Sequence, residues 1–98
     1  MNIHLIIFVA SMNEEQVVTM KKTFQSDFRP VEGDIIDDPG FSPQFHNGYE
    51  VVKVTVNYAT EECWVSLAPL AVELEEISIE EYVEKLQAHG WQVFEIEE

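Results

Sequence analysis

Acidic side chains and one histidine gather in the segment RPVEGDIIDDPGFSPQFH, whose composition suggests a cation site. The candidate ligands are Asp34, Asp37, Asp38 and His46. A calcium loop places oxygen ligands at its first, third and fifth positions, but counting from Asp34 the third position is an isoleucine. Zinc requires more His or Cys than this segment has. The pattern therefore predicts carboxylates that end a strand and shape a Pro-Gly turn, without a metal.

The spacing of the other reactive side chains does not favour catalysis. Cys63 follows Glu61 and Glu62, whose negative charge opposes the thiolate that a nucleophile requires. Glu80 and Glu84 are one helical turn apart on a face expected to be solvated. We therefore expect no burial that would make one of them the acid and the other the base of a catalytic pair. No catalytic triad order accompanies any of the histidines, which are His4, His46 and His89. We predict no catalytic residue and no cofactor.

The net charge excludes more functions than it suggests. The 98 residues hold 19 Asp and Glu and 5 Lys and Arg, a formal net charge of −14. Binding to nucleic acid or to an anionic membrane depends on Lys and Arg, so neither is an expected partner. A basic protein partner fits the charge, and so does simple solubility. A single cysteine, no targeting pattern and no membrane-length apolar run predict a cytoplasmic protein.

The elements that must position these residues begin with two segments whose apolar residues repeat with different periods. We expect one domain over residues 1–98, from its length and 46% hydrophobic content. The run IHLIIFVA predicts a central strand buried on both faces. Residues 11–24 then space Val17, Met20 and Phe24 on one helical face, which predicts a helix. Residues 29–48 are predicted to be a long loop with Pro-Gly and Asn-Gly turns.

A hairpin is expected next. YEVVKVTVNY predicts a strand whose alternation separates one face from the other, with Val52, Val54, Val56 and Tyr58 on the first and Val51, Lys53, Thr55 and Asn57 on the second. ECWVSLAPL predicts its partner, which points Cys63, Val65 and Leu67 to one side and Trp64 and Ser66 to the other. Pro69 ends or bends this strand, and LAVEL resumes as a short edge piece.

The last segment, ISIEEYVEKLQAHGWQVFEIE, has the clearest helix signals. Ser78 is the expected N-cap, with Glu81 completing a capping box. The apolar stripe consists of Ile79, Tyr82, Val83 and Leu86. Gly90 stands where a left-handed residue ends a helix, which brings Trp91 onto Leu86. WQVFEIE predicts a final strand.

The expected architecture is an α+β two-layer sandwich in the ferredoxin-like order βαββαβ, with a long loop inserted before the second strand. Two helices would cover one face of the sheet, and the other face would be open or partly covered by the loop. The alternative is a small SH3-like curled barrel with two flanking helices, in which PVEGDII is a true strand before the hairpin.

A binding surface is the functional feature that remains. Trp64 is expected in the outward row of the hairpin with Tyr49 and Val51, beside the acidic residues Glu73, Glu75, Glu76, Glu80 and Glu84. An exposed aromatic anchor ringed by acid suits a basic partner protein. The opposing possibility is that Trp64 is covered by the loop that carries Phe41 and Phe45. We therefore predict a non-catalytic protein-binding module.

Two alternatives remain open. One is a small-ligand or metal-binding protein, or an enzyme, that uses the 29–48 loop with Asp34, Asp37, His46 and Tyr58 near a pocket. The other is a self-associating structural subunit, in which the first strand and LAVEL extend a sheet across two chains. The oligomeric state is left open by the sequence.

Overall fold

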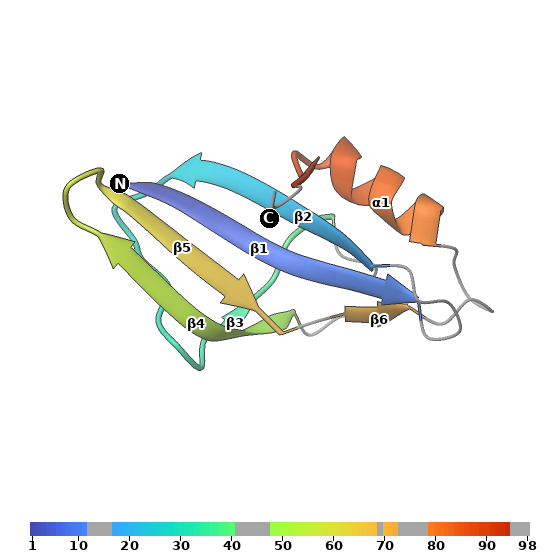
Figure 1. Cartoon of the computed structure of the whole chain (residues 1–98), viewed down its shortest axis with the longest axis horizontal. Coiled ribbons are helices and arrows are strands. Elements are labelled where there is room, and N and C mark those ends of the chain that lie inside the picture. The colour runs from blue at the N-terminus through green and yellow to red at the C-terminus, as the bar shows by residue number, and fades with distance from the viewer. Residues whose placement is uncertain (12–16, 41–47, 69, 73–78, 95–98) are drawn as a thin grey trace.

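The central element of the fold is β1 (Asn2–Ser11). The computed structural model describes residues 1–11, 17–40, 48–68, 70–72 and 79–94. In it, β1 pairs antiparallel with β2 (Val17–Gln25) on one side and parallel with β5 (Glu62–Leu67) on the other, and β6 (Leu70–Val72) continues the second pairing. The apolar run at the start of the chain is therefore a central strand, as predicted (Figure 1).

The remaining strands extend the sheet on both sides. They are β3 (Ile35–Ile36), β4 (Tyr49–Asn57) and β7 (Gln92–Val93), and the strand order is β3-β4-β5-β1-β2-β7. Helix α1 (Ile79–Ala88) is the one helix in the described part of the chain. The described residues thus form a small mixed α/β domain that consists mostly of a curled sheet with one helix (Figure 1). None of its helical residues forms a segment long and apolar enough to cross a membrane.

The helix predicted for residues 11–24 is wrong, because residues 17–25 form β2. Met20 and Phe24 are four residues apart, which fits one face of a helix and equally one face of a strand. The β-branched residues of VVTMKKTFQ favour the strand, and nine consecutive residues pair with β1. The ferredoxin-like order is therefore not confirmed.

The hairpin forms as predicted, but a bulge changes the phase of β4. Val51 pairs with Leu67 while Lys53 pairs with Ser66, so Val52 is an extra residue on this strand. As a result Val51 is buried on the core side and Val52 is exposed. From Lys53 onward the two faces alternate as expected. The segment PVEGDII contributes β3, as the barrel alternative proposed, but β3 stands at the end of the open strand order.

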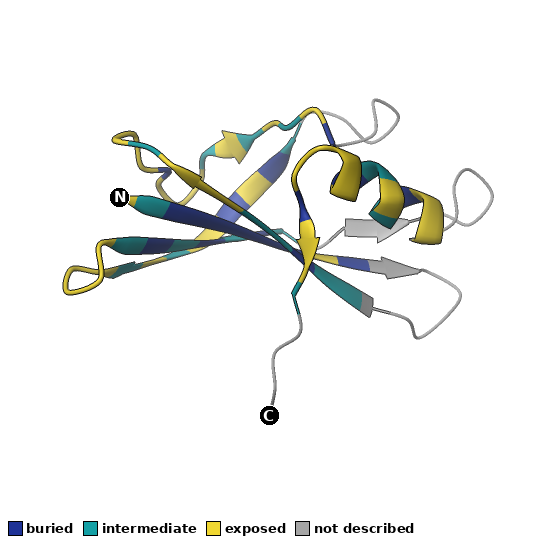
Figure 2. Cartoon of the chain, turned by 90° about the horizontal axis from the view of Figure 1, so that it is seen from above, coloured by how far each residue is buried: buried dark blue, intermediate teal, exposed yellow. Residues whose placement is uncertain are grey.

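The hydrophobic core lies between the sheet and a layer on one of its faces. The sheet side chains that contribute to it include Ile3, Leu5, Ile7, Val9, Met20, Val51, Cys63, Val65 and Leu67. Tyr82 and Leu86 of α1 and the following Trp91 pack onto them. Figure 2 shows α1 on one side of the sheet seen edge-on. The described part of the 29–48 loop lies on this side too, because a side chain at Gly40 would meet Leu86 and His89.

The end of α1 matches the signal in its sequence. Gly90 has a φ of 94°, in the left-handed region that glycine adopts without strain. The Trp91 N–H donates to the Leu86 carbonyl at 3.1 Å, and the Gly90 N–H donates to the Gln87 carbonyl at 3.3 Å. These two bonds form a Schellman motif. The motif turns the chain back so that Trp91 enters the core and β7 reaches β2.

Candidate functional site: the uncovered sheet face around Trp64

The face of the sheet opposite the core has no covering layer among the described residues. Strand pairing aligns its side chains in two rows across four strands. One row is Thr55, Trp64, His4 and Thr23, and the other is Lys53, Ser66, Ile6 and Lys21. Phe8 extends this face along β1, and Phe94 reaches it from the end of β7. We call these ten residues the Trp64 face.

Trp64 is held by an aromatic stack at the centre of this face. Its ring lies 4.1 Å from that of His4 between centroids, with an interplanar angle of 25°. The Phe94 ring is 6.1 Å away on a tilt of 37°. The Lys21 ammonium lies 5.8 Å from the Trp64 ring and 4.9 Å from the Phe94 ring, within the range of a cation–π interaction. These contacts order the indole although it stays partly exposed.

His4 is fixed from both of its ring nitrogens. Its side chain is buried against the sheet, with the whole residue 7% exposed. Nε2 lies 3.3 Å from Oε1 of Glu62, and since a carboxylate accepts, Nε2 donates. In the neutral imidazole Nδ1 then accepts from the hydroxyl of Thr23, at 2.8 Å. With both nitrogens occupied and one ring face against Trp64, His4 acts as a support for the indole.

The charges of the protein are distributed unequally between the two faces. The Trp64 face contains two of the five cationic side chains, those of Lys21 and Lys53, and one carboxylate, that of Glu62 beside His4, lies at its margin. The exposed acids Glu80, Glu81 and Glu84 lie on α1, which covers the opposite face. The contact surface around Trp64 is therefore less acidic than the protein as a whole.

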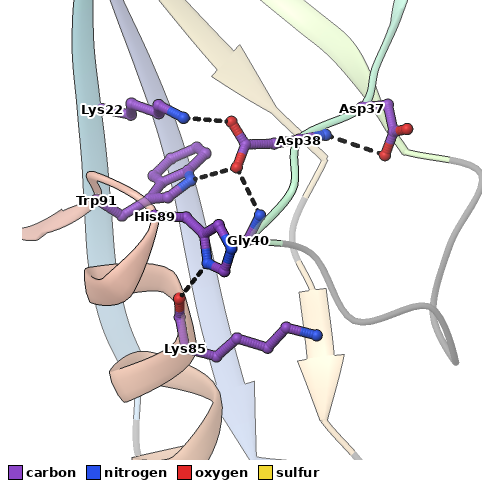
Figure 3. A network of polar contacts seen from close by, with 7 residues as sticks. All are labelled: Lys22, Asp37, Asp38, Gly40, Lys85, His89 and Trp91. Atoms are coloured by element: carbon purple, nitrogen blue, oxygen red, sulfur yellow. Dashed lines mark hydrogen bonds and ion pairs between the residues drawn. The ribbon is translucent and has the colours of Figure 1, made fainter.

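The acidic loop that first suggested a metal site instead contains a structural ion pair. Asp38 accepts from the Lys22 ammonium at 2.7 Å, from the Trp91 indole N–H at 3.1 Å and from the Gly40 N–H at 2.8 Å (Figure 3). Burial alone would raise the pKa of Asp38, but these hydrogen bonds outweigh burial and lower the pKa. The carboxylate thus ties the loop to β2 and to the end of α1.

Two further reactive groups are enclosed in the core. Burial raises the pKa of the Cys63 thiol, and the nearby positive charge of Arg29 only partly opposes this. Cys63 is 0% exposed, so its thiol is both protonated and inaccessible. Burial, followed by the hydroxyl contact with Tyr82 at 3.4 Å, raises the pKa of Tyr49. Neither group has the properties of a nucleophile or base.

The surface predicted around Trp64 is only partly formed. Trp64 lies on an uncovered face, but Tyr49 is 9% exposed and Val51 is 0% exposed, on the core side. The bulge at Val52 is the reason, because it reverses the faces of the residues before it. Glu80 and Glu84 are exposed on α1, away from Trp64. Glu73, Glu75 and Glu76 lie outside the described residues, as do Phe41, Phe45 and His46.

The residues near Trp64 that sequence reasoning missed are His4, Lys21 and Phe94. His4 and Lys21 alternate with core residues, so their face was predictable once both segments were known to be strands. The helix predicted for residues 11–24 removed Lys21 and Thr23 from consideration. Phe94 depends on where β7 joins the sheet, which no local pattern specifies.

The described members of the alternative ligand site in the 29–48 loop are not grouped together, and His46 lies outside the described residues. Asp34 is bonded to Val51 near the start of β4, whereas Tyr58 follows the last residue of β4. About 20 Å of extended strand separates the two positions. Asp37 accepts from the Asp38 N–H at 2.9 Å, and within the described residues no three His, Cys, Asp or Glu side chains are grouped to hold a metal ion.

Comparison of the chain with protein-family models, with curated proteins and with solved structures finds no significant match. The geometry and charge of the Trp64 face are therefore the features that indicate a function.

Proposed function

We propose that this protein is a non-catalytic module that binds a basic partner protein through the Trp64 face. The observation that supports the proposal most strongly is the ordered, partly exposed Trp64 on a sheet face that no described element covers. Tryptophan is among the residue types that dominate binding energy at protein interfaces. Because His4 and Phe94 already restrict the indole, Trp64 loses little further side-chain freedom when a partner binds. The cytoplasm is the proposed location.

Charge supports the choice of a basic partner. A net charge of −14 attracts a cationic protein over a distance comparable to the Debye length and so speeds encounter. The contact face itself contributes the partly exposed Trp64 and the exposed Phe8 together with two lysines. We therefore propose a partner that is basic overall and presents an apolar patch, with a carboxylate placed to meet Lys21 or Lys53.

The test is selection of peptides from a random library on the wild-type protein, followed by affinity measurement against Trp64→Ala. We expect the selected sequences to combine Lys or Arg with apolar residues and to bind Trp64→Ala at least about tenfold more weakly, as for an interface anchor. Trp64→Phe is the conservative control and should retain most of the affinity. Equal binding to wild type and to a folded Trp64→Ala protein would reject the site.

A separate variant tests whether the negative charge speeds association with a basic partner. Glu80→Gln, Glu81→Gln and Glu84→Gln combined remove three exposed acids from α1 and leave the Trp64 face unchanged. We expect slower association and weaker salt dependence, with the dissociation rate nearly constant. If the selected peptides lack basic residues, or if added salt does not slow association, the basic partner is wrong. Sedimentation of the protein alone distinguishes self-association, which the like charges oppose.

A further inference from the structure

The outer edge of β4 is largely unpaired in the described residues. β3 pairs only with Tyr49 and Glu50, and two more bonds join Val51 to Gly33 and Asp34. Beyond the bulge at Val52, no described strand lies beside residues 53–57, because β3 ends the strand order on this side (Figure 1). An uncovered edge is a template for another strand.

The direction of the backbone groups on this edge follows from the pairing of β5. The Asn2 N–H donates to the Glu61 carbonyl, so the odd-numbered residues of β5 direct their backbone groups toward β1. The even-numbered residues, including Trp64, then direct theirs toward β4. Thr55 lies opposite Trp64 and completes the hydrogen-bonded pair.

Val54 and Val56 consequently direct their N–H and C=O groups away from β5, to the unpaired edge. Their side chains pack against the margin of the core and are partly exposed. An added strand would therefore find backbone partners at two alternate positions and an apolar margin on the core side. Residues 53–57 contain no proline, and Lys53 is the one charge among them.

Charge indicates which segment this edge would accept. Exposed Glu50 stands near the start of β4, in a protein whose net charge is −14. The opposite edge of the sheet is different, because β2 has Lys21 and Lys22 beside its pairing with β7. Charge complementarity therefore favours β4 for a basic segment.

We propose that an extended basic segment of the partner adds to β4 as a new strand, paired with Val54 and Val56. This inference rests on the proposed function, and it specifies the chemistry of the ligand. The segment has apolar residues at alternate positions, which contact Val54 and Val56, and a Lys or Arg at the end that meets Glu50. Main-chain hydrogen bonds supply the affinity, and the alternate side chains supply the selectivity.

The test uses the full chain and a capped peptide, Lys-Val-Thr-Val-Thr-Val-Lys, followed by NMR. We expect saturable binding that slows hydrogen exchange of the Val54 and Val56 amides by about tenfold or more, as new hydrogen bonds form. Two control peptides keep the test independent of protein stability. One carries N-methyl groups at alternate residues, and the other has Glu in place of Lys; both should fail to protect these amides.

Protein variants then separate this inference from the proposed function. Val56→Pro removes an outward N–H without breaking a bond to β5, and it should weaken peptide binding about tenfold. If Trp64→Ala abolishes binding while a folded Val56→Pro protein binds normally, the edge inference fails and the proposed function stands. Absence of saturable peptide binding, or protection of both amides by dimerisation without peptide, also overturns the inference.

Discussion

The two faces of β1 show two ways of burying a side chain in one sheet. Ile3 and Ile7 are both 0% exposed beneath the layer that contains α1 and the loop. On the Trp64 face, His4 and Ile6 are 7% and 8% exposed without such a layer among the described elements. Their neighbours on adjacent strands enclose them laterally, most clearly the indole of Trp64. Lateral packing thus orders a sheet face while leaving its outer surface available to a partner.

The polar groups of the two faces differ in the same way. On the covered face, Asp38 accepts one hydrogen bond within its own loop, from Gly40, and two from Lys22 and Trp91, which are distant in sequence and fasten the loop to β2 and to the end of α1. On the Trp64 face, the bonds of His4 to Thr23 and Glu62 lie within the sheet and join neighbouring strands. We infer that the first set stabilises the fold and that the second orients a binding surface.

The largest expected difference between the faces concerns the two tryptophans. Trp91→Ala removes a 2% exposed ring from the core and should lower the free energy of unfolding by about 3–5 kcal/mol. Trp64→Ala should cost about 1–2 kcal/mol, because part of the ring is already hydrated. Urea denaturation measures both, with Trp64→Phe and Trp91→Phe as controls. Equal costs would contradict the distinction between a core face and a binding face.

The Asp38 network provides the next prediction. Asp38→Asn removes the ion pair with Lys22 and should destabilise the protein by about 1–3 kcal/mol at pH 7. Because the folded state lowers the pKa of Asp38, its stabilising effect is complete above the ordinary carboxyl pKa and is lost as pH falls through the folded value.

The stability gap between wild type and Asp38→Asn should therefore narrow below about pH 4. Urea denaturation of both proteins at several pH values measures this gap. Using the difference cancels the general effect of protonating the other carboxylates. A gap that stays constant down to the acid transition would show that the charge of Asp38 does not contribute.

The smallest predicted effect is on the Trp64 face. Thr23→Val keeps the shape of the side chain but leaves Nδ1 of His4 without the hydroxyl, which should cost about 1 kcal/mol. Thr55→Val, at an exposed position in the same row, is the matched control and should change stability by no more than about 0.5 kcal/mol. Equal effects of the two variants in thermal melts would exclude a specific role for Thr23.

Much of the fold was predictable where the apolar residues follow a single period, either that of a helix or that of a strand. The helix signals from Ile79 to Gly90 led to α1 and its glycine-dependent end, and the alternation in ECWVSL placed Cys63 and Trp64 on opposite faces as observed. The segment VVTMKKTFQ was mispredicted because its apolar spacing fits both periods. Only its pairing with β1 decides for the strand.

The candidate site was less predictable than the fold. Trp64 was identified from its alternation, but assigning Tyr49 and Val51 to its face assumed an uninterrupted strand. A bulge is one extra residue, which the sequence does not mark, and it reverses every side chain before it. The side of the sheet that the loop covers depends on Asp38 meeting Lys22 and Trp91, and such distant contacts have no local pattern.

The position of β1 between β2 and β5 has a consequence for biosynthesis. β1 and β2 are neighbours in the chain and can pair early, but the contact between His4 and Glu62 joins residues 58 positions apart. One edge of an apolar strand therefore stays open until the second hairpin has left the ribosome. Long-range pairing of this kind slows folding and prolongs the exposure of an aggregation-prone edge. Newly made chains are thus most vulnerable to aggregation before residue 67 emerges.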